Sequence, residues 1–175
     1  MLQVSLNDLL DYTEWQRAKW QAVLQHMGPE VLRVSAGPHG DGRFTTVGDL
    51  IRHIFSAEKR YVERLRGQPL TDTAKLTLND LDALFSFGRE SRKGLRDFVD
   101  TFPSAQWDMV QEFTLMNSLL RATPRKIIVH VVMHEIRHWA QVATLLRLQG
   151  LTGEFHDFLF SPVLGGEFQR GESRP

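Results

Sequence analysis

The sequence predicts an all-α protein built as a bundle of four helices. Four long segments carry apolar residues at helical spacing. Each of them is bounded by residues that favour helix ends, and no stretch of comparable length alternates as a β-strand does. Long amphipathic helices must bury their apolar faces against one another. Four of them within 175 residues therefore favour one bundle domain.

The first predicted helix covers residues 6–27. Ser5 is its expected N-cap, and the Gly-Pro pair at 28–29 ends it. Leucines and other apolar residues form one stripe along it. Trp15 lies opposite that stripe and Tyr12 lies on its flank, so the two aromatic rings serve either a dimer interface or a second buried face.

The second predicted helix covers residues 47–66, with Thr45 or Thr46 as its N-cap and Gly67 as its end. It has a clear apolar stripe at helical spacing, with His53 on the flank. This flank position allows the imidazole to face a neighbouring helix.

The third predicted helix covers residues 78–102, between Thr77 and Pro103. Its two internal glycines weaken the prediction of a regular helix, because glycine lowers helix propensity. The following stretch, 104–122, is ambiguous and is expected to contain short extended pieces that cross the bundle.

The fourth predicted helix begins with the N-cap Thr123 and with Pro124 at its first position, and it runs to Gly150. It is apolar nearly all round, so we expect it to be the most buried helix. We assign residues 1–160 to the bundle domain and 161–175 to a polar C-terminal tail.

The composition excludes several functions. The chain has no cysteine, which rules out thiolate metal sites, a cysteine nucleophile and disulfides, and favours a reducing compartment. Its net charge is zero with no basic run, which argues against a nucleic-acid partner. No signal peptide is recognisable, and no apolar run approaches the roughly 20 residues that span a bilayer. We expect a cytoplasmic protein without a membrane partner.

The fourth predicted helix carries His130, His134 and His138 at intervals of four residues. Such a step turns a side chain by only about 40°, so neighbouring members share a face, and an i, i+4 pair can bind one divalent ion. The alternative is a set of buried histidines with satisfied hydrogen bonds. Without cysteine, a further ligand must be a carboxylate or another histidine, and the remaining histidines are His26, His39, His53 and His156.

The segment HEIRH at 134–138 also fits the zinc-protease motif His-Glu-x-x-His. The rest of the protease pattern is missing. Gln141 and Thr144 stand where a metzincin has glycine and histidine, and Glu154 follows the helix without a helical context. No strands are predicted that could bind an extended peptide. A protease is therefore disfavoured.

Two stretches, TVGDLIRHIFSAEKRYVERL and HVVMHEIRHWAQVATLLRLQG, together with the closing LTGEFHDFLF, resemble the DinB/YfiT-like family of metal-dependent proteins. The shared features are a second-helix histidine followed by Ala-Glu and spaced histidines in the last helix. The resemblance implies an up-down-down-up four-helix bundle with a long connection before the last helix.

The resemblance also implies a divalent metal ion, Zn or Ni, bound by His53, His134 and His138. His130 matches a family histidine that is usually not a ligand, so we expect it in the second shell. Glu58 could orient a ligand histidine through its free ring nitrogen, or could form a surface ion pair with Lys59 or a nearby arginine.

By the same resemblance, the expected activity is a thiol S-transferase or hydrolase acting on small electrophiles, with a bacillithiol- or mycothiol-type thiol as co-substrate. Glu135 and Gln141 are the candidates for catalysis, although Glu135 projects about 100° from His134 and fits a salt bridge as well. Trp139 and Ala140 replace the family's usual Arg-Gly. The alternative is a non-catalytic metal-binding or dimerisation bundle in a stress response, and we expect a homodimer.

Overall fold

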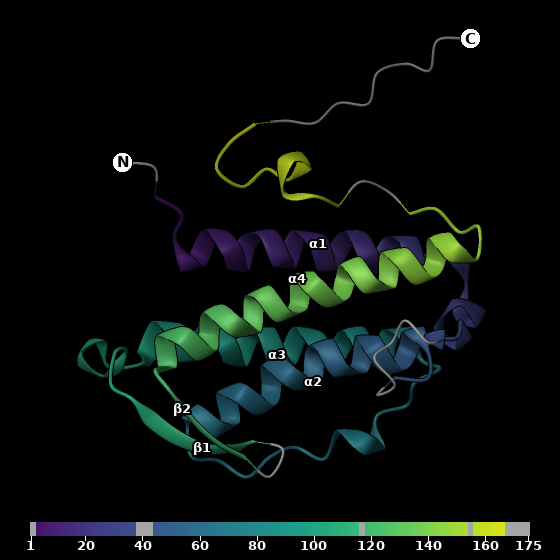
Figure 1. Ribbon diagram of the computed structural model, residues 1–175. Helices are drawn as coiled ribbons and strands as arrows, with labels where there is room; N and C mark the ends of the chain where they lie inside the picture. Colours follow the sequence, from purple (N-terminus) through teal and green to yellow (C-terminus); the bar gives the residue numbers. More distant parts are fainter. Residues whose placement is uncertain (1–2, 38–43, 116–117, 154–155, 167–175) are drawn as a thin grey trace.

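The computed structural model describes residues 3–37, 44–115, 118–153 and 156–166. Four long helices and one two-stranded hairpin make up the fold (Figure 1). Their bounds are Leu6–Met27 (α1), Val47–Leu65 (α2), Leu81–Thr101 (α3), Gln111–Leu115 (β1), Ser118–Ala122 (β2) and Pro124–Leu148 (α4).

The helices pack in the order that an up-down-down-up bundle requires. In Figure 1, α1 and α4 run in one direction and α2 and α3 run in the other. Helix α2 contacts both α3 and α4, whereas α1 contacts α4 and α3. The connection between α3 and α4 is long and contains the hairpin. This arrangement is consistent with the predicted four-helix bundle.

Three of the four predicted helix starts are confirmed. The side chains of Ser5, Thr46 and Thr123 each accept a hydrogen bond from the backbone amide three residues further on. The predicted start of α3 at Thr77 is wrong, because Asp80 caps the helix instead. Aspartate is a stronger N-cap than threonine, and here its carboxylate accepts the amide hydrogen of Ala83.

The segment before α4 does contain short extended pieces. Strands β1 and β2 pair antiparallel, with Gln111 opposite Ala122 and Leu115 opposite Ser118. Their side chains are mostly exposed or half-buried. The sequence predicted extended pieces here, but not their pairing into a hairpin.

Helix α4 is not the most buried helix, contrary to the prediction. Twelve of its 25 residues are buried, against eleven of 19 in α2. It presents an exposed stripe that includes the apolar side chains of Val129, Met133 and Leu148. The two glycines of α3 leave that helix continuous, and Gly88 allows the ring of Phe55 to pack where a Cβ atom would lie 2.9 Å from it.

The aromatic pair predicted on α1 is partly covered. The Tyr12 hydroxyl donates a hydrogen bond to the carbonyl oxygen of His156, and the Tyr12 ring packs edge-on against Phe158. Tyr12 is buried and Trp15 is half-buried. Tyr12 thus belongs to the second buried face considered for α1, and the homodimer stays a prediction. The predicted boundary at residue 160 also stays a prediction, and residues 167–175 of that tail lie outside the described part.

Each helix contributes one charged side chain to a buried ion-pair network. The two arginines are Arg17 on α1 and Arg92 on α3, and the two carboxylates are Glu58 on α2 and Glu135 on α4. No side chain of the four is more than 8% exposed. Nη2 of Arg17 lies 2.8 Å from Oε2 of Glu58, and Nη2 of Arg92 lies 2.7 Å from Oε2 of Glu135.

The network is saturated with hydrogen bonds. Arg17 also donates to the carbonyl oxygen of Gly88, and the indole of Trp139 donates to Glu135. Burial alone would raise the pKa of Glu58, but the charges of Arg17 and Arg92 outweigh burial and hold that pKa below its usual value. Glu58 therefore stays ionised beside the two arginines.

The network lies between two hydrophobic clusters. On α2, for example, Glu58 stands between Phe55 of one cluster and Val62 of the other. The same holds on α4, where Glu135 stands between Val132 and Trp139. Because an unpaired charge in such a core is costly, this layer restricts which turns of the four helices can face one another.

We predict that Glu135→Ala destabilises the protein strongly. It leaves Arg17 and Arg92 with too little negative charge in a dry core, which costs about 3–5 kcal/mol of unfolding free energy. The matched control is Glu30→Ala, whose ion pair with Arg33 is exposed and contributes at most about 1 kcal/mol. Urea unfolding followed by circular dichroism measures both. Equal, small losses in the two variants would contradict the structural role of the network.

Candidate metal centre

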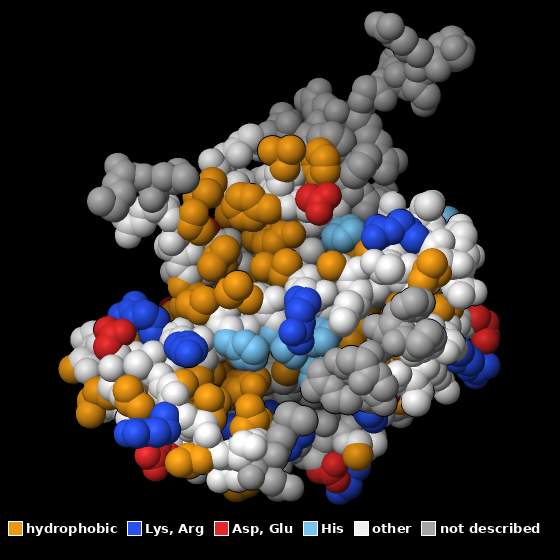
Figure 2. Space-filling view, in the orientation of Figure 1, with side chains coloured by type: hydrophobic (Ala, Val, Ile, Leu, Met, Phe, Trp, Pro, Cys, Tyr) orange, Lys and Arg blue, Asp and Glu red, His pale blue; other side chains and the backbone are white. Residues whose placement is uncertain are grey.

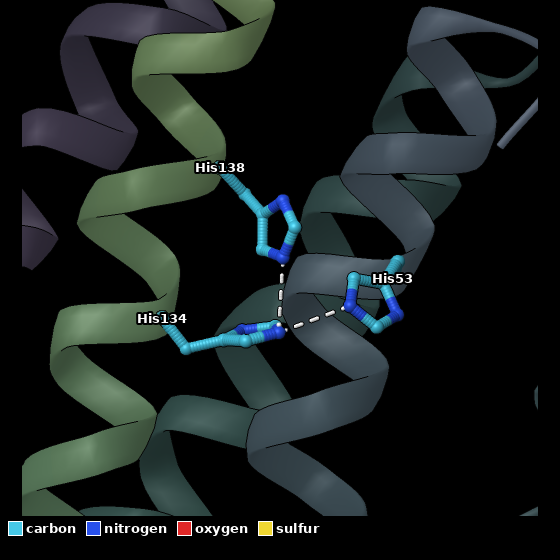
Figure 3. Close-up of side chains that lie close together, drawn as sticks. All are labelled: His53, His134 and His138. Atoms are coloured by element: carbon cyan, nitrogen blue, oxygen red, sulfur yellow. Dashed lines mark hydrogen bonds between the residues drawn. The ribbon is translucent and has the colours of Figure 1, made fainter. Parts of the chain in front are cut away.

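Three histidine side chains from two helices point toward one another (Figure 3). His53 comes from α2, and His134 and His138 come from α4. Nε2 of His134 lies 3.0 Å from Nε2 of His53 and 3.0 Å from Nε2 of His138. One ligand atom from each residue can be chosen so that all three lie within 4.8 Å of one another.

The local sequence and the ion-pair network together produce this meeting. His134 and His138 are one helical turn apart, so their rings share one face of α4. Glu135 follows His134 directly, and Glu58 lies five residues after His53. Since both glutamates join the same network, α2 and α4 are held at the level where His53 faces His134.

The protonation of the cluster suits a metal ion. The side-chain oxygen of Gln141 accepts a hydrogen bond from Nδ1 of His138, so Nε2 of His138 carries a lone pair. Burial, together with neighbouring His138 and His53, lowers the pKa of His134 to about 2. The ring of His134 is therefore neutral at physiological pH.

The spacing also fits a metal ion. Around a tetrahedral zinc ion with nitrogen ligands 2.0–2.1 Å away, the ligand atoms lie about 3.3 Å from one another. The two contacts of 3.0 Å are close to this value, and ligand atoms of all three residues lie within 4.8 Å of one another. Among the described residues, His53, His134 and His138 form a group of side chains that could hold a metal ion. A neutral imidazole carries one N–H, so three converging Nε2 atoms are more readily satisfied by a shared cation than by one another.

A cavity of about 470 Å³ opens beside the cluster. His53 and His134 line it, together with residues of α2, α4 and the end of β1. Figure 2 shows histidine side chains at the molecular surface, with Lys or Arg side chains next to them. A small molecule can therefore reach His53 and His134 from solvent, whereas His138 is fully buried.

Two other predicted site residues lie at the cluster. The ring of His130 is 5.6 Å from that of His134 and 5.5 Å from that of Tyr61, and it lines the same cavity. The side-chain oxygen of Gln141 accepts a hydrogen bond from Nδ1 of His138, a proposed ligand. This contact gives Gln141 a positioning role, because it fixes the tautomer and the orientation of the ring.

The two predicted glutamates are held in the ion-pair network. Glu58 forms an ion pair with arginines, as one alternative predicted. The pair is buried, however, so the prediction of a surface position is wrong. Its carboxylate is occupied by Arg17 and Arg92, which argues against a role in orienting a ligand histidine. Glu135, which a protease would use as its general base, is bound in the same network.

Two other described histidines, His26 and His156, are not part of the cluster. His26 lies in the last turn of α1, and the ring of His156 packs 4.6 Å from that of Trp20. His39 and Glu154, both considered as ligands, lie outside the described residues.

Sequence reasoning missed two neighbours of the cluster. Nη2 of Arg137 lies 3.2 Å from Nε2 of His138, a contact that a metal ion bound there would replace. The ring of Phe44 lies 4.5 Å from that of His53 and covers the cluster from the loop before α2. Arg137 could have been noticed as a cation within the HEIRH segment, whereas Phe44 stands in a glycine-rich loop with no periodic signal.

Fold and site together define a helical protein in which two helices carry a three-histidine candidate metal centre. The model of the DinB family matches residues 1–166, nearly the whole chain. The chain therefore belongs to the DinB family. No curated protein matched the sequence. Within the described residues, none of the helices has the length and apolar character needed to cross a membrane.

We predict that the purified protein binds close to one divalent ion per chain and that His53→Ala and His138→Ala each lose it. A metal held by three imidazoles needs both helices, so removal of either one breaks the site. His26→Ala removes a histidine away from the cluster and should keep the ion. Elemental analysis of folded, tag-free protein gives the stoichiometry. Retention of metal in His53→Ala would contradict the two-helix site.

We also predict that Gln141→Ala weakens metal binding without abolishing it. Loss of the hydrogen bond to Nδ1 of His138 frees the ring, and such losses lower metal affinity by about 10–100-fold. Gln149→Ala, at the C-terminal end of the same helix, should bind as the wild type does. Competition with a chromogenic chelator measures the affinity. An unchanged affinity in Gln141→Ala would remove its positioning role.

Proposed function

We propose that this protein is a metal-dependent enzyme that activates a small nucleophile at His53, His134 and His138. The preferred reaction is transfer of a low-molecular-weight thiol to a small electrophile, with hydrolysis as the alternative use of the same site. The observation that supports this proposal is the convergence of three imidazoles beside an open cavity, which His53 and His134 line.

The ligand set favours catalysis over a purely structural site. Structural zinc sites have four protein ligands, whereas catalytic sites typically have three and an open position. A divalent ion held by three neutral imidazoles keeps its full charge and can lower the pKa of a bound water or hold a thiol as thiolate. Imidazole ligands suit Zn and Ni, which are the ions we propose.

The chain's own residues supply positioning. Gln141 orients His138, and Phe44 covers part of the cluster with an apolar ring. The chain contains no cysteine, so a thiol used here must come from a second substrate. The cavity of about 470 Å³ is in the range of small-molecule sites. We therefore propose two small substrates.

The proposal predicts that an added thiol binds at the metal centre. We expect protein loaded with Co²⁺ to develop a thiolate-to-cobalt absorption band when N-acetylcysteine is added, because the open position accepts sulfur. His138→Ala should show no band, and His26→Ala should match the wild type. Transfer of the thiol to monobromobimane is then measured with the native metal.

Two results would contradict this function. A cobalt spectrum that does not respond to thiol or to azide would indicate a site closed by a fourth protein ligand and would favour the non-catalytic metal-binding bundle. Bimane transfer at the same rate in wild type and His138→Ala would separate the reaction from the metal centre.

A further inference from the structure

The cavity beside the histidine cluster is lined by three arginines. Arg60 and Arg64 reach it from α2, and Arg137 reaches it from α4. None of its described lining residues is an aspartate or a glutamate. Within the part of the chain that the structure describes, no ion pair joins any of these arginines to a carboxylate. The described lining thus supplies no negative charge, although the charge of Glu63 outside the lining acts on Arg64.

Two buried polar atoms at this cavity lack a hydrogen-bond partner among the described residues. They are Nε of Arg60 and Oγ of Ser56. Ser56 is only 6% exposed, so its hydroxyl has little access to water. A buried donor without a partner costs free energy, and proteins rarely retain one without a ligand or water to satisfy it. Both atoms can donate a hydrogen bond, which is what an anion requires.

The positive charges also disfavour one another. The pKa of Arg64 is lowered by burial and by the nearby charge of Arg60. The guanidinium of Arg64 lies over the ring of Tyr61, 5.6 Å from its centre, and the ring face attracts its positive charge. A negative group in the cavity would also offset the repulsion between Arg60 and Arg64.

The arginines extend to the edge of the metal centre. Nη2 of Arg137 lies 3.2 Å from Nε2 of the ligand His138, whereas Arg60 and Arg64 lie further along α2 past His53. A molecule that fills this cavity therefore meets the arginines, His53 and His134 at once.

We propose that this cavity binds the anionic end of a small carboxylate- or phosphate-bearing substrate through Arg60, Arg64 and Arg137. The planar guanidinium groups match carboxylate and phosphate oxygens in paired hydrogen bonds. The reactive end of the molecule then lies at the histidine cluster. The substrate class rests on the proposed function, but binding of the anion by the arginines does not require the metal.

The test is a ligand-detected NMR titration with succinate at constant ionic strength, with neutral succinamide as the matched probe. Protein as purified and protein treated with a chelator are compared. We expect succinate, and not succinamide, to bind in both. Arg60→Gln and Arg137→Gln should each weaken binding on the order of tenfold, because each removes charged hydrogen bonds. Arg33→Gln removes an exposed arginine already paired with Glu30 and should bind as the wild type does.

Each outcome decides the inference. Succinate binding that depends on Arg60 and Arg137 and survives the chelator supports the subsite, even if the protein proves to hold no metal. Binding that disappears with the chelator and is equal in all arginine variants overturns it, since the metal alone would then hold the carboxylate. Equal binding of succinate and succinamide, or no binding of either, also overturns it. Inorganic phosphate, titrated in the same way, distinguishes a phosphate subsite from a carboxylate subsite.

Discussion

The buried network of Arg17, Glu58, Arg92 and Glu135 is the constraint on which the rest of the structure depends. Each helix supplies one charge, and the charges cancel only when all four helices meet at the same level. Buried ion pairs contribute little net stability, since desolvation offsets much of their attraction. Their larger effect is to disfavour other alignments of the helices. A helix shifted by one turn would leave a charge unpaired between two apolar clusters. We infer that the network sets the level of the bundle.

The geometry of the candidate metal centre depends on how the ion-pair network aligns α2 and α4 along the bundle. One glutamate of the network follows His134 in α4, and the other lies on α2 beyond His53. The glutamate of the HEIRH segment is therefore used to hold the bundle together, while its two histidines join a third from another helix. This division of roles explains why a protease-like motif occurs without the remainder of a protease. His53 and His134 line an accessible cavity, and the charged network lies buried in the core.

Sequence reasoning predicted the helices and proposed the histidine cluster, but it did not predict the ion-pair network that joins the helices. Periodicity and capping are local, so Ser5 and Thr123 could be recognised directly. The spacing of His134 and His138 predicted a shared face, but the partner His53 came from the family resemblance, because spacing within one helix does not say which helix it meets. The position of Arg17 could have been noticed in the sequence. It stands seven residues, or about two helical turns, from both Leu10 and Leu24, so it lies on the buried face of α1. A charge at such a position indicates a buried partner.

The most direct test of the account is X-ray absorption spectroscopy of the metal-loaded protein. We predict a first shell of three imidazole nitrogens at about 2.0–2.1 Å, completed by exchangeable oxygen from solvent. In His53→Ala that retains any metal, the imidazole count should fall to two. A wild-type shell with two imidazoles or fewer, or one closed by a fourth protein ligand, would contradict an open centre built from α2 and α4.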